Sequence, residues 1–243
     1  MTFKILYLYP DILDLYGDEG NIEVLKYRLK KRNIKCIVDT YSLYEKKPDF
    51  SSYNLVFMGG GADKEQSILQ DDLLKYKQDI KSAIKNGVFF LLICGGYQLF
   101  GKYYKDASKN IIKGLGIFNY YTESTDRKKR NIGNIIISSK IDKKEYKVIG
   151  FENHGGITKN VNTPFGKIIY KNKNNLDTYE GFMKKNVIGT YLHGPLLSKN
   201  PYIADYIIET GLNKNKFNYK LESINDDLEN NLRENLINRF MHK

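Results

Sequence analysis

The stretch Val88–Gly101, reading VFFLLICGGYQLFG, constrains the fold more than any other part of the chain. Its first half, Val88–Ile93, is apolar without a polar break, as in a buried parallel strand. Cys94 follows directly, then two glycines that allow a sharp turn, and apolar residues return with helical spacing. A side chain at such an elbow lies at the carboxyl edge of a sheet, where open α/β sheets place their sites and a helix N-terminus favours a thiolate. A buried structural cysteine before an ordinary loop is the alternative.

Strand-like and helix-like segments alternate through the first hundred residues. This alternation is typical of a parallel sheet with crossover helices. The pattern predicts strands at 3–8, 35–41, 55–58 and 88–93, and helices at 19–33 and 65–85. From about residue 115 the segments are short, broken by Gly, Asn and Asp, and typical of antiparallel strands. These later strands are predicted at 117–122, 134–139, 146–152, 167–170 and 187–192, followed by helices at 202–210 and 225–241.

No segment has the composition of a linker, and no internal repeat is visible. We therefore predict a single three-layer α/β domain over residues 1–243. Its central sheet should be mostly parallel, in the manner of flavodoxin-like folds, with antiparallel strands added in the C-terminal half.

The composition excludes several classes of protein. Hydrophobic residues make up 41% of the chain, too many for a disordered protein. Two cysteines are too few for a disulfide framework, and Cys36 lies in a strand-like run, so we expect it in the core. We find no signal peptide and no apolar stretch near the ~20 residues that cross a bilayer. These features predict a cytoplasmic protein.

The formal net charge of +11 raises the question of a nucleic-acid partner. The lysines are spread along the chain, and the short basic stretches Arg28–Arg32 and Arg127–Arg130 carry no nucleic-acid-binding signature. We therefore expect a solvated basic surface and no nucleic-acid partner, with an acidic partner or anionic ligand as the alternative.

A thiolate nucleophile needs a base and donors for the oxyanion that it creates. Of the three histidines, His193 follows a predicted strand in GTYLHGPLL and His154 follows another in GFENHGG, whereas His242 is next to the C-terminus and is set aside. The loop Gly59–Gly61 also follows a strand, and its N–H groups suit an oxyanion. A loop histidine without chemistry is the alternative for His193. The cysteines and histidines lack metal-ligand spacing, so we expect no metal site.

Together these motifs resemble the class I glutamine amidotransferases: GGG-x-D after a strand, CGGYQ at an elbow, and a late YLHGP. The similarity is to the cobyric acid synthase-like branch, in which the glutamate of the usual Cys-His-Glu triad is missing. Here Pro195 stands in its position. The segment LYPDILDLYGDEGNIEVLKYR is similar to the GatD-type glutaminase subunits of lipid II isoglutaminyl synthases. The resemblance spans nearly the whole chain.

The resemblance implies that Cys94 attacks the side-chain amide of L-glutamine and that His193 is the base that also protonates the departing ammonia. Arg130, in KKRNIGN, matches a position that the family uses to hold the glutamine substrate, and a guanidinium suits this role because it grips a carboxylate with two parallel hydrogen bonds. A charge in a basic loop is the alternative for Arg130. The other residues expected at the site are Gly60, Gly61 and Gly95 as oxyanion donors, with His154, Glu152, Asn153 and Gln98 in the site wall.

The missing glutamate leaves open what orients His193, because a histidine base works best when another group fixes its tautomer. Three candidates remain: Glu152, a backbone carbonyl, or a carboxylate of a partner subunit. We hypothesise that the partner completes the triad.

The resemblance also implies a heterodimer with a Mur-ligase-like, MurT-type synthetase subunit, which binds ATP and magnesium and amidates the D-glutamate α-carboxyl of lipid II. This chain has no phosphate-binding loop of the G-x-x-x-x-G-K-[ST] type and should hold no cofactor. The complex would lie near the inner face of the membrane through its lipid II substrate. The alternatives are another acceptor, as in cobyric acid synthases, a non-catalytic scaffold for a synthetase, and an α/β cysteine peptidase.

Overall fold

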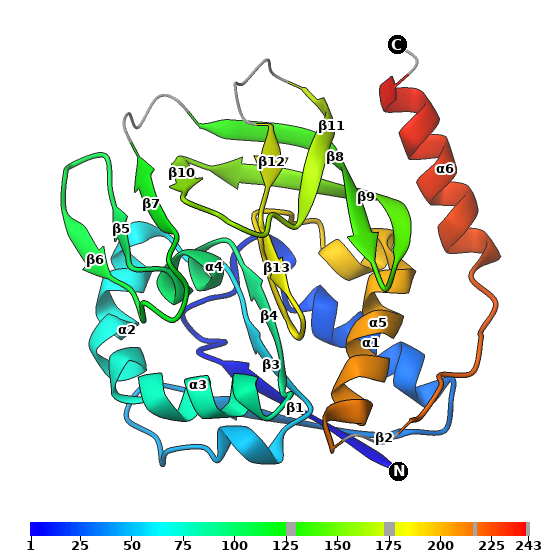
Figure 1. Cartoon of the computed structure of the whole chain (residues 1–243), viewed down its shortest axis with the longest axis horizontal. Coiled ribbons are helices and arrows are strands. Elements are labelled where there is room, and N and C mark those ends of the chain that lie inside the picture. Colours follow the sequence, from blue (N-terminus) through cyan, green and yellow to red (C-terminus); the bar gives the residue numbers. More distant parts are fainter. Residues whose placement is uncertain (125–129, 173–177, 216–217, 242–243) are drawn as a thin grey trace.

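The computed structural model describes residues 1–124, 130–172, 178–215 and 218–241. Its central sheet has six strands in the order β13-β14-β4-β3-β1-β2 (Figure 1). All neighbouring pairs are parallel except β13 with β14. The strands are β1 (Thr2–Leu8), β2 (Lys35–Tyr41), β3 (Leu55–Met58), β4 (Phe89–Ile93), β13 (Phe182–Lys184) and β14 (Val187–Thr190).

Helices cover both faces of this sheet, which explains why β3, β4 and β14 are buried along their whole length. On one side lie α1 and α5, and on the other α2, α3 and α4 (Figure 1). The bounds of these helices are α1 (Gly20–Lys30), α2 (Asp63–Lys75), α3 (Lys77–Lys85), α4 (Gly95–Phe100) and α5 (Pro201–Leu212). The three-layer α/β prediction is therefore confirmed.

Two smaller sheets lie beyond the carboxyl edge of the central sheet (Figure 1). One has the order β10-β7-β5-β6, and the other is an antiparallel sheet with the order β12-β11-β8-β9. Their strands are β5 (Tyr103–Lys105), β6 (Ile111–Lys113), β7 (Tyr121–Ser124), β8 (Asn131–Ile141), β9 (Lys144–His154), β10 (Gly156–Lys159), β11 (Gly166–Lys171) and β12 (Tyr179–Glu180). The C-terminal helix α6 (Asp227–Met241) packs on the second of them through Ile237.

The predicted long helices and buried strands match the structure, and the differences have local causes. The segment predicted as one helix over 65–85 is two helices, α2 and α3, which meet at Tyr76. The strand predicted at 117–122 is β7, which begins later, at Tyr121. The prediction missed β5, β6, β10, β12 and β13, whose two to four residues are too few to show a period.

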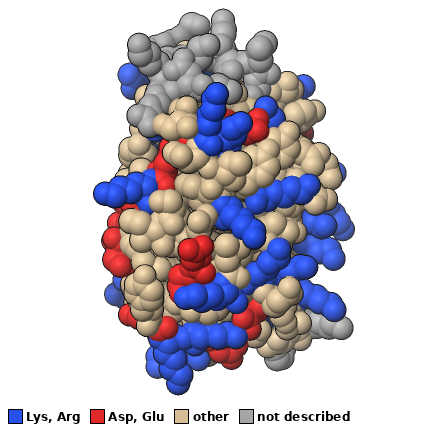
Figure 2. All heavy atoms as spheres, turned by 90° about the vertical axis from the view of Figure 1, so that its left-hand side faces the viewer, with Lys and Arg blue, Asp and Glu red and all other residues tan. Residues whose placement is uncertain are grey.

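The surface confirms part of the charge prediction. On the face shown in Figure 2, Lys and Arg are spread among acidic and neutral residues and do not form one continuous patch. Arg28 and Arg32 depart from the prediction of a solvated basic stretch, because both are buried. The other predicted stretch falls largely on Arg127–Lys129, outside the described residues. Within the described part of the chain, no helix is long and apolar enough to cross a membrane.

Arg28 ties three segments together. Its guanidinium binds both carboxylate oxygens of Asp205 in α5, at 2.7 and 2.6 Å, and both of Asp226, at 2.6 and 2.9 Å, just before α6. Arg32 adds a bond of 2.8 Å to Asp205. Ion pairs in which a guanidinium binds both oxygens of a carboxylate are the strong ones. This cluster therefore fixes α1 against α5 and the start of the C-terminal helix.

We expect Arg28→Met to lower the free energy of unfolding by about 3 kcal/mol, because it leaves the partly buried Asp226 without its partner and Asp205 with Arg32 alone. Lys30→Met, an exposed position on the same helix, should change it by less than about 0.5 kcal/mol. Denaturant titration of both variants measures the difference. Equal stability of the two would contradict a structural role for the cluster.

Candidate active site

Four neighbouring parallel strands bring the candidate residues to one edge. Because β1, β3, β4 and β14 run in the same direction, their carboxyl ends meet. The loop before α1 follows β1, Gly59–Gly61 follows β3, Cys94 follows β4 and His193 follows β14. The antiparallel sheet reaches the same place, since Phe151 of β9 exchanges two backbone hydrogen bonds with His193, at 3.1 and 2.8 Å.

Cys94 occupies a strained turn between β4 and α4. Its φ of 50° and ψ of −103° lie in a region of backbone angles that residues other than glycine rarely adopt. Its backbone N–H donates to Thr190 O at 2.7 Å. Gly96 allows the close approach that this turn requires, because a Cβ there would lie 2.7 Å from Met58 O. Backbone strain of this kind persists where the surrounding structure holds it and is concentrated at functional sites.

His193 is held by a carboxylate of the same chain. Its Nδ1 lies 2.9 Å from Oδ1 of Asp18, and both side chains are buried. The second carboxylate oxygen of Asp18 accepts the N–H of Gly60, also at 2.9 Å. His193 Nε2 is buried and has no hydrogen-bond partner among the described residues. The bond to Asp18 fixes the tautomer and leaves Nε2 available for chemistry.

Gly60 lies between the nucleophile and the base. A Cβ on Gly60 would be 3.2 Å from Cys94 Cβ, 3.2 Å from His193 Cε1 and 3.2 Å from Asp18 Oδ2. The thiol, the imidazole and the carboxylate therefore meet around a position where any side chain would crowd all three.

The electrostatics of the site favour a charged imidazole. Burial lowers the pKa of His193, but the hydrogen bond to Asp18 and the nearby Cys94 outweigh it and raise that pKa to about 10. An imidazolium next to Cys94 stabilises the thiolate, which is the reactive form of a cysteine.

The hypothesis that the partner completes the triad is replaced by this finding. Neither Glu152 nor a backbone carbonyl is bonded to His193 Nδ1, since Asp18 takes that place. Asp18, in the loop after β1, binds His193 where the glutamate of the usual triad would do so. Pro195, which stands in its position, packs on Gly20, where a Cβ would lie 2.4 Å from Pro195 Cγ. The sequence held one signal that could have pointed to Asp18. The loop after the first strand is rich in aspartate, and a loop that follows a parallel strand lies at the same sheet edge as Cys94 and His193.

Gly60 differs from the prediction in a second respect. Its only N–H donates to Asp18 and is not free for an oxyanion, so its predicted role was wrong. Gly61 and Gly95 remain the candidates for that role. A Cβ on Gly95 would lie 3.0 Å from Gly61 N, so the two backbones meet beside Cys94.

A cavity of about 700 Å³ opens in front of Cys94. Arg130 also lines this cavity and makes three hydrogen bonds to Asn153, of which the shortest, from Nη2 to the side-chain oxygen, is 2.9 Å. The predictions for Arg130, Asn153, His154 and Gln98 therefore agree with the placement of these residues in one cavity. Gln66, which the prediction missed, also lines the cavity; it donates to Gln98 at 2.8 Å, and its own Oε1 has no partner among the described residues.

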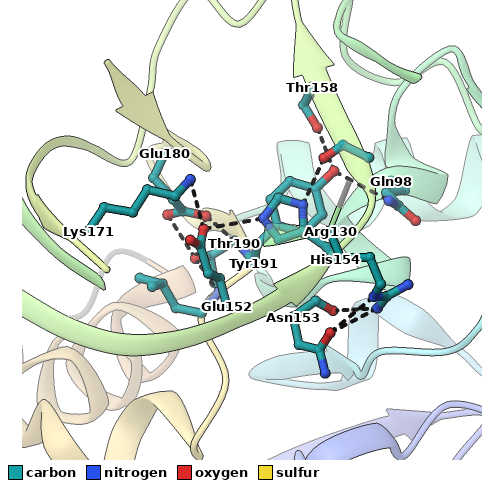
Figure 3. A network of polar contacts seen from close by, with 12 residues as sticks. Gln98, Arg130, Glu152, Asn153, His154, Thr158, Lys171, Glu180, Thr190 and Tyr191 are labelled. Atoms are coloured by element: carbon teal, nitrogen blue, oxygen red, sulfur yellow. Dashed lines mark hydrogen bonds and ion pairs between the residues drawn. The ribbon is translucent and has the colours of Figure 1, made fainter. Parts of the chain in front are cut away.

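Glu152 is the predicted wall residue that points elsewhere. Figure 3 shows it turned toward Lys171 and His154, and the distances are 3.1 and 3.4 Å. Glu152 does not line the catalytic cavity. Successive side chains of a strand point to opposite faces, so Glu152 and the neighbouring Asn153 lie on different sides of β9. His242 lies outside the described residues. Among the residues that are described, no group of three or more His, Cys, Asp and Glu side chains could hold a metal ion.

Comparison with known proteins assigns this site to a family. Residues 4–201 match the model of the CobB/CobQ-like glutamine amidotransferase domain. The chain belongs to this family of glutamine amidotransferases.

Its relatives include two proteins named lipid II isoglutaminyl synthase (glutamine-hydrolyzing) subunit GatD. The Staphylococcus aureus protein is 39% identical over 237 residues, covering 97% of this chain and 95% of that protein. The Streptococcus pneumoniae protein is 42% identical over 214 residues, covering 87% and 81%. Both are named as subunits of a synthase. Cobyric acid synthases match at 29–33% identity, over only 34–43% of their own length.

Solved structures support the fold. A crystal structure of a glutamine amidotransferase superposes with a TM-score of 0.55 at 14% identity, covering 85% of this chain and 98% of that one. At this identity the likeness shows the fold alone, and it confirms the predicted class I amidotransferase architecture.

We expect Asp18→Asn to lower kcat for glutamine hydrolysis by about 10²-fold or more, because the neutral amide no longer supports the imidazolium. The variant should also move the alkaline limb of the pH–rate profile to lower pH. In the wild type, the Asp18–His193 pair stabilises the folded chain fully below the ordinary His pKa of 6.5 and loses this effect as the pH rises through about 10. Asp18→Asn removes that contribution.

Asp11→Asn is the matched control. It lies in the same loop but is exposed and bonds Ser42, so the profile should stay that of the wild type. An Asp18→Asn profile that superposes on the wild-type profile would show that the carboxylate does not act on His193.

Proposed function

We propose that this chain is the glutaminase subunit of a lipid II isoglutaminyl synthase. It would hydrolyse L-glutamine and deliver ammonia to an ATP-dependent, Mur-ligase-like partner that amidates the D-glutamate α-carboxyl of lipid II in peptidoglycan synthesis. The observation that carries this proposal is the buried Asp18–His193 pair beside the strained Cys94. The near full-length similarity to two GatD subunits supports the choice of acceptor.

The first half of the reaction forms a thioester. The Cys94 thiolate attacks the side-chain amide carbon, and the carbonyl oxygen takes up negative charge facing the N–H groups of Gly61 and Gly95. His193 then gives its Nε2 proton to the amide nitrogen, the C–N bond breaks, and ammonia leaves. Asp18 keeps the imidazole oriented through the transfer.

The second half releases glutamate. Neutral His193 accepts a proton from water through Nε2 while the water oxygen attacks the thioester carbon. The same two N–H groups hold the second oxyanion, and the C–S bond breaks to restore the Cys94 thiolate beside the imidazolium. The new γ-carboxyl group keeps the second proton of the water and releases it to solvent, so protons and charge balance over the cycle.

Substrate selection follows from the cavity in front of Cys94. The guanidinium of Arg130, held in place by Asn153, suits the α-carboxylate of glutamine. The free Oε1 of Gln66 is an acceptor for an N–H group of the substrate. Together they favour a free amino acid that carries a side-chain amide.

The partner supplies what this chain lacks. We propose a heterodimer in which the synthetase binds ATP and magnesium, since carboxylate activation needs both and our chain is proposed to hold no cofactor. We place the complex in the cytoplasm, near the inner face of the membrane through its lipid II substrate. A cobyric acid synthase-like acceptor is less favoured, because the chain corresponds to about a third of those proteins but to nearly all of GatD.

The deciding experiment uses the complex with the synthetase partner and two nitrogen sources. Cys94→Ala should abolish amidation with glutamine and leave amidation with ammonium chloride intact, because only the thioester step needs the thiol. Product formation is measured by mass spectrometry of the amidated acceptor.

Cys36→Ala is the matched control; this half-buried thiol lies in β2, and its removal should leave both nitrogen sources in use. If Cys94→Ala still supported glutamine-dependent amidation, the chain would be a non-catalytic scaffold.

A further inference from the structure

Glu180 is a buried carboxylate that the reaction described above leaves without a role. It is 6% exposed and lines a second cavity of about 610 Å³. This cavity shares His154 with the catalytic cavity, but of the two cavities Glu180 lines only the second. A buried carboxyl group is costly unless hydrogen bonds compensate for the lost water, so the partners of Glu180 indicate what it does.

A turn at Gly181 brings Glu180 to the end of β14. Glu180 is the last residue of β12 in the antiparallel sheet, and β13 of the central sheet begins at Phe182. The chain therefore changes sheets at Gly181, where φ is 64° and a Cβ would lie 2.6 Å from Gly189 O. Glycine suits this position because it has no Cβ and adopts a positive φ freely. The turn sets Glu180 beside the strand that leads to His193.

The carboxylate of Glu180 takes the place of a neighbouring strand where β14 ends. It accepts the N–H of Tyr191 at 2.7 Å and the hydroxyl of Thr190 at 2.9 Å (Figure 3). The hydroxyl oxygen of Thr190 in turn accepts the N–H of Leu192 at 3.1 Å. His193 follows, and its own N–H bonds β9. Glu180 therefore supplies, directly or through Thr190, the partners of both backbone N–H groups that lie between β14 and the base.

The same strand end holds the nucleophile. Thr190 O accepts the N–H of Cys94 at 2.7 Å, in the turn where Cys94 has its strained backbone angles. Thr190 thus bonds Glu180 through its side chain and Cys94 through its carbonyl group. Because a strained turn persists only where the surrounding structure holds it, the position of Thr190 affects the thiol as well as the imidazole.

We propose that Glu180 is a positioning residue for glutamine hydrolysis, which acts through Thr190 and Tyr191 to hold Cys94 and His193 at reacting distance. The inference rests on the proposed glutaminase function and deepens it, because it assigns the group that sets the geometry of the two reacting side chains. A displacement of about 1 Å in such groups can lower a rate about 10²-fold.

Removing the carboxyl group tests the proposal in the complex with the synthetase partner. Glu180→Ala should lower kcat for glutamine hydrolysis about tenfold or more and leave KM within about twofold, because Arg130 and the other groups that line the glutamine cavity keep their places. Ammonia release, measured over a range of glutamine concentrations, gives both constants.

The conservative variant Glu180→Gln should restore most of the rate. Its amide oxygen accepts the N–H of Tyr191, and its NH₂ group can donate to the hydroxyl oxygen of Thr190. Burial raises the pKa of Glu180 to about 7, so near neutral pH part of the wild-type population already carries a neutral carboxyl group. Thr190→Val keeps the shape of the side chain and removes the hydroxyl, so it should lower kcat without raising KM.

Alkylation by iodoacetamide reports the position of the thiol in the absence of glutamine. An imidazolium beside Cys94 maintains the reactive thiolate, so Glu180→Ala should slow alkylation of Cys94 about fivefold or more. Cys36 in β2 is the internal reference, and its alkylation should not change. Peptide mass spectrometry measures both cysteines in one sample.

Tyr179→Ala is the matched control. Tyr179 is the neighbour of Glu180 in β12 and is 58% exposed, so its variant should keep the wild-type kcat and the wild-type alkylation rate of Cys94.

Three results would overturn the proposal. Wild-type kcat and alkylation in both Glu180→Ala and Thr190→Val would show that the reacting groups do not depend on this carboxylate. A Glu180→Gln variant no faster than Glu180→Ala would show that hydrogen-bond geometry is not what Glu180 provides. Faster alkylation of Cys94 and Cys36 alike would show a general loss of stability. A wild-type complex that hydrolyses no glutamine would refute the proposed function itself, and the alkylation of Cys94 would still test the role of Glu180.

Discussion

The carboxylate of Asp18 is the interaction on which the rest of the site depends. A buried charge without partners is costly, and this one is matched by the imidazole of His193 on one oxygen and the N–H of Gly60 on the other. These two bonds join the loops that follow β1, β3 and β14. A single side chain therefore sets the orientation of the base, the position of the glycine loop and, through Gly60, the space around Cys94.

Helices α1 and α5 connect the carboxylate of Asp18 to the segment that follows His193. Helix α1 starts two residues after Asp18, and Asn21 in its first turn accepts the N–H of Leu197 at 3.0 Å, shortly after His193. Arg28, two turns further along α1, binds Asp205 of α5. The base and its carboxylate are thus linked twice, directly and through α1 and α5, which limits their relative movement.

Two cavities lie beside the site and share His154 in their lining. The space in front of Cys94 is lined by Arg130 and Gln66, and the second space by tyrosine and threonine side chains together with Glu152, Lys171 and Glu180. Both arise where the antiparallel sheets meet the carboxyl edge of the parallel one. The strands added in the second half of the chain therefore line both cavities, whereas the parallel half carries Cys94.

By itself the sequence determined the parallel half of the fold and indicated Cys94 and His193 as the candidate nucleophile and base. The run Val88–Ile93, followed by Cys94 and two glycines, predicts a buried strand and a sharp turn, and the alternation before it permits few topologies. Only the tertiary structure decided the partner of His193, because Asp18 lies 175 positions away and reaches it through strand order. The role of Gly60 and the placement of Glu152 were decided in the same way, since a hydrogen bond depends on where a group points, and periodicity in a sequence carries no record of that direction.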